Sequence, residues 1–139
     1  MSEVTITKTV FFDVPPEIVW GYLTESEKLE KWFHRSDRDL KEGEDYALVA
    51  EADDGAVIKQ CWGKVLTMNP PRLLVYTFTV VPLRGFMTTV RWELENCAGG
   101  TKITLHHSGL KGTEEELGLI KALDAGWDEH LGRLRQKAS

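Results

Sequence analysis

The chain has 139 residues, of which 42% are hydrophobic and 28% charged, and its formal net charge is −5 at pH 7. This length predicts one domain over residues 1–139 that can bury an apolar core. The negative charge argues against a nucleic-acid partner, and the sequence has no apolar run near the roughly 20 residues that span a bilayer. The first residues lack the charged-then-apolar order of a signal peptide, which favours the cytoplasm.

The first part of the chain predicts one strand followed by two short helices. Thr5–Phe12 is rich in β-branched and aromatic residues, which is typical of a strand. Val14–Phe33 then predicts two helices, the first begun by a Pro-Pro pair and the second by a capping box, Thr24-x-x-Glu27. Because this segment offers large apolar side chains and no reactive group, it favours a binding cavity over a catalytic centre.

Five more strands are predicted between turn sequences that contain glycine or proline. Their expected ranges are Asp45–Ala52, Val57–Met68, Leu73–Val81, Phe86–Glu95 and Thr101–Ser108. A turn is expected at Pro82–Gly85, and Gly63 predicts a bulge or bend inside the second of these strands. Strands that follow one another through short turns imply an antiparallel sheet with one covered face.

The last element is a long amphipathic helix, expected from Thr113 to about Gln136. It begins with a second capping box, Thr113-x-x-Glu116. Its apolar stripe consists of Leu117, Ile120, Leu123, Trp127, Leu131 and Leu134. We expect this stripe to cover the concave face of the sheet, with a ligand in the space between them. Gly126, near the covered face, indicates either close approach of the sheet or room for a cavity.

The candidate functional residues are mostly large side chains that strand or helix periodicity turns inward. For each tryptophan the alternatives are plain core packing and a cavity wall, and a buried tyrosine hydroxyl needs a partner in either case. His107 shares a strand face with Ile103 and Leu105. It is a structural histidine, a polar anchor for a ligand or, least favoured, a general acid or base. The expected cavity set is Trp32, Phe33, Tyr46, Tyr76, Phe78, Trp92, His107, Trp127 and Leu131.

Other chemistry finds little support in the sequence. His106 points away from His107 on a flat strand, so the pair cannot hold one metal ion, and no zinc spacing is present. His34 and His130 are expected to be exposed or partly exposed. No phosphate loop, nucleophile elbow or dinucleotide fingerprint occurs, so we expect no metal and no cofactor. Cys61 and Cys97 are interpreted as reduced thiols, since no disulfide framework surrounds them.

Several short sequence motifs together resemble those of a known superfamily. They are the Pro-led helix with Val19, Trp20 and Leu23, the following Leu29 and Trp32-Phe33, then GKV at 63–65, NPPRLLVYTF at 69–78, GT at 100–101, HSG at 107–109 and GW at 126–127. The chain resembles the helix-grip superfamily (START or birch-pollen-allergen-like, SRPBCC). Within it, the chain is similar to homologues of the C-terminal domain of the activator of the ninety-kilodalton heat-shock chaperone ATPase. This resemblance implies an α+β fold with a curved antiparallel sheet of about six strands around a long C-terminal helix, and two short N-terminal helices.

The resemblance specifies fold better than function, since superfamily members bind lipids, sterols, polyketides or hormones and a minority are enzymes. Our first hypothesis is non-catalytic binding or sensing of a small hydrophobic molecule between the sheet and the C-terminal helix. The second is a co-chaperone-like interaction module with a role in stress response, whose partner is a chaperone or a second copy of the chain. The third is a polyketide-cyclase-like or dehydratase-like enzyme that uses His107 and a tyrosine. The residues favour a non-enzyme.

Overall fold

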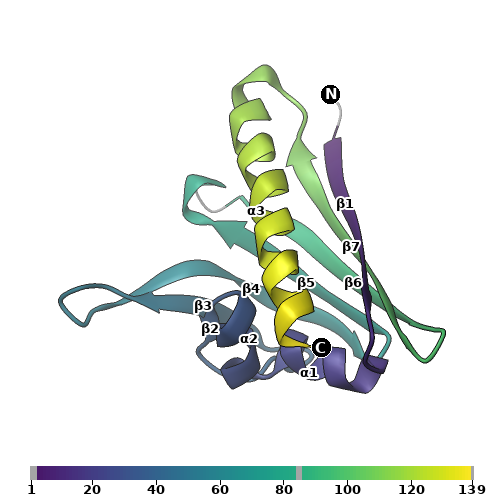
Figure 1. Ribbon diagram of the computed structural model, residues 1–139. Helices are drawn as coiled ribbons and strands as arrows, with labels where there is room; N and C mark the ends of the chain where they lie inside the picture. Colours follow the sequence, from purple (N-terminus) through teal and green to yellow (C-terminus); the bar gives the residue numbers. More distant parts are fainter. Residues whose placement is uncertain (1–2, 84–85, 139) are drawn as a thin grey trace.

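The computed structural model describes residues 3–83 and 86–138 and has an α+β architecture (Figure 1). Its strands are β1 (Glu3–Phe12), β2 (Arg35–Ser36), β3 (Asp45–Glu51), β4 (Val57–Asn69), β5 (Leu73–Val80), β6 (Thr88–Cys97) and β7 (Gly100–Lys111). The α-helices of the described residues are α1 (Pro16–Thr24), α2 (Ser26–Trp32) and α3 (Leu117–Lys137). Two short 3₁₀ turns, η1 (Val81–Leu83) and η2 (Glu114–Glu116), precede β6 and α3.

The strands form one curved antiparallel sheet in the order β1-β7-β6-β5-β4-β3-β2. Helix α3 runs across the inner face of this sheet, and α1 and α2 lie at the end of the sheet where α3 finishes (Figure 1). The sequence-based expectation of an antiparallel sheet covered by the last helix is confirmed.

The inner face of the sheet carries the core in the alternation that the sequence predicts. On β6, Val90, Trp92 and Leu94 are buried, and on β7 the residues paired with them are buried as well. Trp92 lies opposite Leu105, and Val90 lies opposite His107. Because side chains alternate between the two faces of a strand, these pairs place one continuous apolar surface beneath α3.

The sheet has seven strands where the sequence predicted about six. The additional strand is β2, which pairs with β3 through Arg35↔Val49 and Ser36↔Leu48. A strand of two residues is too short to show period-two alternation, so the sequence carries no signal for it. In the turn predicted at Pro82–Gly85, Val81–Leu83 form η1, whereas Arg84 and Gly85 lie outside the described residues.

Both predicted capping boxes are wrong in their hydrogen bonding. Thr24 is the last residue of α1 rather than the cap of α2, and its hydroxyl donates to the Trp20 carbonyl at 3.0 Å. The cap of α2 is Glu25, which makes no side-chain capping bond. Thr113 does cap η2, also without such a bond. The chain breaks where it was expected to break, but backbone bonds close these turns instead.

The two register shifts of β4 flank Gly63 and do not fall on it. Leu48 and Val49 of β3 pair with Cys61 and Lys59, so Gln60 is an extra residue in β4. Another shift follows Val65, in the pairing with β5. Gly63 is required for a different reason: a Cβ atom there would lie 2.0 Å from the Thr77 carbonyl oxygen. The backbone of β5 approaches too closely for any side chain.

Helix α3 buries only part of its apolar stripe. Trp127, Leu131 and Leu134 are buried, and Ile120 and Leu123 are half-buried. Leu117 was expected to pack on the sheet, but 63% of it is exposed. The first turn of the helix therefore extends beyond the surface that it was predicted to cover.

Candidate functional site

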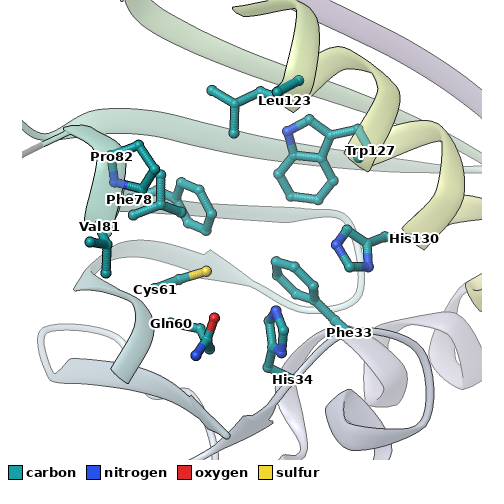
Figure 2. A pocket seen from close by; sticks show the side chains of 13 residues that line it. Phe33, His34, Gln60, Cys61, Phe78, Val81, Pro82, Leu123, Trp127 and His130 are labelled. Carbon is teal, nitrogen blue, oxygen red and sulfur yellow. The ribbon is translucent and has the colours of Figure 1, made fainter. Parts of the chain in front are cut away.

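An apolar pocket lies between α3 and the β4–β5 part of the sheet, beside the end of α2 (Figure 2). Its volume is about 270 Å³. It is lined by Phe33, His34, Gln60, Cys61, Phe78, Val80, Val81, Pro82, Ala122, Leu123, Gly126, Trp127 and His130. These residues come from the α2–β2 junction, the inner face of the sheet, η1 and α3, so no single element forms the site.

Two local features of the backbone make room for the pocket. At Gly126 a Cβ atom would meet no neighbouring atom within 4 Å, so the glycine of α3 faces open space rather than a tightly packed strand. Of the two alternatives predicted for Gly126, close approach of the sheet and space for a cavity, the structure therefore favours space for a cavity. In β4, the extra residue Gln60 breaks the alternation, and both Gln60 and Cys61 line the pocket.

Aromatic rings form the apolar part of the wall. The Trp127 ring centroid lies 5.5 Å from that of Phe33 and 6.0 Å from that of Phe78. Phe33 also packs edge-on against His130 at 4.6 Å. Figure 2 shows these rings converging on the space below Leu123. Contacts at these distances hold the rings in place, so the pocket has a formed wall before any ligand enters.

A buried hydrogen-bond chain behind this wall joins α3 to the sheet. The indole N–H of Trp127 donates to His107 Nδ1 at 3.0 Å. Since an indole can only donate, the neutral imidazole carries its proton on Nε2 and donates to the Thr88 hydroxyl at 2.7 Å. Thr88 Oγ1 in turn donates to the Phe78 carbonyl at 2.6 Å. Burial lowers the pKa of His107 to about 4, so the ring is neutral at pH 7.

His107 is therefore a connector in this structure, with both ring nitrogens bonded to protein. It is fully buried and does not line the pocket. The hydrogen bonds through His107 and Thr88 connect Trp127 with the Phe78 backbone, two parts of the pocket wall.

Two other histidines border the pocket directly. The rings of His34 and His130 lie 5.9 Å apart between their centroids. Arg133 Nη2 donates to His130 Nδ1 at 2.7 Å. Burial, aided by the charges of Arg133 and His34, lowers the pKa of His130 to about 4. Burial and the Arg133 charge also lower the pKa of His34. Both rings are consequently neutral donors and acceptors at pH 7.

The structure divides the nine sequence-predicted cavity residues into two groups. Phe33, Phe78 and Trp127 line the pocket. The others lie in the surrounding core, where their polar atoms are satisfied: Trp32 Nε1 donates to the Tyr22 carbonyl, Tyr46 Oη to the Thr77 carbonyl, and Trp92 Nε1 to Tyr76 Oη. Leu131 packs in the same core.

Sequence reasoning did not select His34, Gln60, Cys61 or His130 for the site. For His130 a signal existed, because it lies three residues after Trp127 and so shares its helix face. His34 directly follows the Trp-Phe pair. Gln60 gave no signal, since only the bulge turns it toward the pocket.

The pocket offers little for nucleophilic or metal chemistry. Cys61 is free, and burial raises its pKa to about 12, so the thiol stays protonated at pH 7. Within residues 3–83 and 86–138, no three histidine, cysteine or acidic residues come together as a metal site. Cys97, also free, is exposed and remote from the lining. Neither cysteine forms a disulfide in the structure.

A second hollow, of about 550 Å³, lies at the other end of α3 between η1 and η2. Glu115, Glu116 and Lys111 contribute to its lining. Although it is larger, its charged border suits water better than an apolar molecule. The pocket beside Trp127 is therefore the stronger candidate for a ligand.

Comparison with known proteins agrees with this fold. The family model described as Activator of Hsp90 ATPase homolog 1-like protein matches residues 13–138. No curated protein matches the chain in sequence. None of the helices in the described part of the chain is both long and apolar enough to cross a membrane.

Solved structures with the same fold include three of particular interest. MLL2253 from Mesorhizobium loti is 24% identical, with a TM-score of 0.79 over 96% of this chain and 95% of its own. DynU16, encoded in the dynemicin biosynthetic locus, is 22% identical, with a TM-score of 0.77 over 95% of this chain and 46% of its own. The Aha1 dimer from Colwellia psychrerythraea is 18% identical, with a TM-score of 0.74 over 95% of this chain and 93% of its own. The chain has the helix-grip fold and belongs to the Activator of Hsp90 ATPase homolog 1-like family.

Proposed function

We propose that this protein binds a small, mainly apolar molecule without transforming it. The observation that carries the proposal is the pocket itself, where Gly126 leaves space and Phe33, Phe78 and Trp127 form an apolar wall. Ligand sites are typically concave and apolar, with a few polar groups that set orientation. His34, His130 and Gln60 supply such groups here.

The size of the pocket narrows the ligand. Sites for drug-sized molecules usually enclose about 300–1,000 Å³. At about 270 Å³, this pocket suits a molecule of one or two rings, or a short branched chain, rather than a sterol or a diacyl lipid. We therefore place the ligand among small aromatic or alicyclic compounds.

The chemistry of the pocket supports binding over catalysis. General acid–base work needs a titratable group within reach of the substrate and with a pKa near the working pH. Both nitrogens of His107 are bonded to protein, the Cys61 thiol stays protonated, and the lining contains no carboxylate among the described residues. The cyclase-like or dehydratase-like reading thus loses His107, the residue that was expected to act as its acid or base.

A second candidate is an interaction module, and the family match favours it. The family is named for a chaperone ATPase activator, and one structural neighbour is described as a dimer. Exposed apolar side chains near η1, namely Val81, Phe86 and Met87, offer a contact surface. Sedimentation of the purified protein tests self-association, and the ATPase rate of the ninety-kilodalton chaperone, measured with and without this protein, tests the other partner.

Filling the pocket tests the binding proposal. Gly126→Leu should place a side chain in the pocket, whereas Gly132→Leu adds the same side chain to α3 at a site with open space outside it. Titration with a fluorescent naphthalene dye should show binding to the wild type and to Gly132→Leu, and a loss of at least tenfold in Gly126→Leu. Native mass spectrometry of the freshly purified wild type would reveal a retained ligand. Equal dye binding by all three proteins would place the site elsewhere.

A further inference from the structure

We propose that the ligand of this pocket is a small apolar acid whose carboxylate lies beside His34 and His130, in the field of Arg133. The inference rests on the proposed function and adds the chemical class of the ligand. It follows from where charges and donors lie around the pocket.

The pocket is distinctly different in charge from the chain as a whole. The chain carries a net charge of −5, yet its thirteen lining residues include no aspartate or glutamate. The basic side chains in the lining are His34 and His130, both neutral at pH 7, and Figure 2 shows the Phe33 ring between them. An anion entering there meets no carboxylate in the wall.

His130 is oriented as a donor to the pocket. The His130 ring has two protein partners, the Arg133 guanidinium at Nδ1 and the Trp32 backbone. A guanidinium can only donate, so its bond makes Nδ1 an acceptor and leaves the proton of the neutral ring on Nε2. Figure 2 shows the His130 ring projecting from α3 toward Phe33 and the pocket space. An Nε2–H group directed there can bond to a ligand oxygen.

Arg133 supplies a fixed positive charge behind this donor. Besides His130, its Nε donates to the Trp32 carbonyl at 3.3 Å and its Nη1 to Glu129 Oε1 at 3.0 Å. The Arg133 side chain is 41% exposed and that of Glu129 is 71% exposed, so water screens the carboxylate more strongly than the guanidinium. The Glu129 charge opposes that of Arg133 at His130 but has the smaller effect. The Arg133 charge lowers the pKa of both His34 and His130, which shows that its field reaches both rings. That field favours a bound anion.

The remaining wall accounts for the other end of the ligand. Phe78 and Leu123 lie away from the histidine pair in Figure 2, Trp127 stands beside His130 at 6.4 Å between ring centroids, and Cys61 is a protonated thiol. A molecule that extends from the pair to this wall has an anionic head and an apolar, one- or two-ring body. A carboxylate gains a charge-assisted hydrogen bond at His130 and attraction to Arg133, whereas an alcohol of the same shape gains only a neutral bond.

Two matched probes test the acid. 2-Naphthoic acid and 2-naphthalenemethanol share a ring system and differ in charge. In calorimetric titrations at pH 7.5, the wild type should bind the acid at least tenfold more tightly than the alcohol. His130→Phe keeps a ring in place and should weaken the acid by at least tenfold, as expected for a lost hydrogen bond to a charged group. It should leave the alcohol within about threefold.

His106→Phe is the matched control, because His106 bonds to Glu93 on the outer face of the sheet. It should leave both affinities unchanged. Salt offers a test without substitution: raising sodium chloride from 0.05 to 1 M should weaken the acid and spare the alcohol. Equal wild-type affinity for the two probes, or equal loss of both in a folded His130→Phe, overturns the acid and leaves apolar binding standing. Failure of both probes and of the naphthalene dye overturns the proposed function itself.

Discussion

The two halves of α3 carry the same apolar stripe and do different things with it. In the C-terminal half, Trp127, Leu131 and Leu134 are buried, and Trp127 packs edge-on against Trp92 of the sheet at 5.7 Å. In the N-terminal half, Leu117 is exposed and Leu123 borders the pocket. The C-terminal half closes the core, although Trp127 and His130 also border the pocket, and the N-terminal half covers the rest of the pocket.

This difference shows what an amphipathic pattern specifies. Periodicity gives the direction in which a side chain points, because it reflects only the local helix geometry. How deeply the side chain is buried depends on the separation of helix and sheet, which is set by all the elements that pack between them. Around Trp127 that filling comes from α2, whose Trp32 lies 6.0 Å from Trp92.

Truncating the stripe in each half should give the largest contrast. Trp127→Ala removes a side chain that is 3% exposed and contacts rings on three elements, so it should cost about 3–5 kcal/mol of unfolding free energy. Leu117→Ala, at 63% exposure, should cost less than about 0.5 kcal/mol. Urea unfolding of the three proteins measures both. A loss below about 1 kcal/mol for Trp127→Ala would contradict the tight packing of the C-terminal half of α3 against the sheet.

The hydrogen bonds through His107 should make the stability of the folded state depend on pH. The folded pKa of about 4 lies below the unfolded value of about 6.5, so the neutral ring favours the folded state. This contribution is complete above pH 6.5 and is lost as the pH falls toward 4. Between pH 7 and pH 5, stability should fall by about 2 kcal/mol from this group.

His107→Gln provides the comparison, since an amide can accept from Trp127 and donate to Thr88 without titrating. Its stability, measured by urea unfolding at both pH values, should fall by about 2 kcal/mol less than that of the wild type. The other histidines, including His130, titrate in both proteins and cancel in the difference. The same pH dependence in both proteins would mean that His107 does not carry the effect.

Much of the fold was predictable because it rests on local periodicity. The inner faces of β6 and β7 follow period two, so Val90, Trp92 and even the polar His107 could be assigned inward from sequence. The two early helices and the long last helix also carry their own signals. β2 could not be found, because two residues show no period.

The site was less predictable, since it depends on gaps between elements. Periodicity pointed Tyr76 and Trp92 inward as correctly as Phe78, yet only Phe78 reaches the pocket. The partner of His130 at the pocket edge is His34, 96 positions earlier in the sequence, and only the fold brings the two rings within 5.9 Å. The set of lining residues thus records three-dimensional spacing that no single segment encodes.

Glycine replacement sharpens the comparison on a smaller scale. Gly126 faces the pocket and Gly132 lies six residues later in the C-terminal half of α3, and a Cβ atom at either would meet open space. Alanine at each position should therefore stabilise the protein by roughly 0.5–1 kcal/mol through helix propensity. Thermal unfolding of both variants checks this. Destabilisation by Gly126→Ala would show that the sheet approaches more closely than the open pocket implies.

The smallest expected effect lies where the two halves meet, at Lys8 of β1. Its ammonium pairs with Asp124 at 2.6 Å and Asp128 at 2.9 Å, one on each side of the Gly126 turn. Both aspartates are more than half exposed, so solvent weakens the pairs. Lys8→Met keeps the apolar stem and removes the charge, and it should cost about 0.5–1 kcal/mol in urea unfolding at low salt. In 1 M sodium chloride the difference from the wild type should nearly disappear, because screening removes the same attraction. A cost that stays constant with salt would instead assign the stabilisation to packing of the lysine stem against α3. Apolar contact, rather than charge, would then hold this part of α3 to the edge of the sheet.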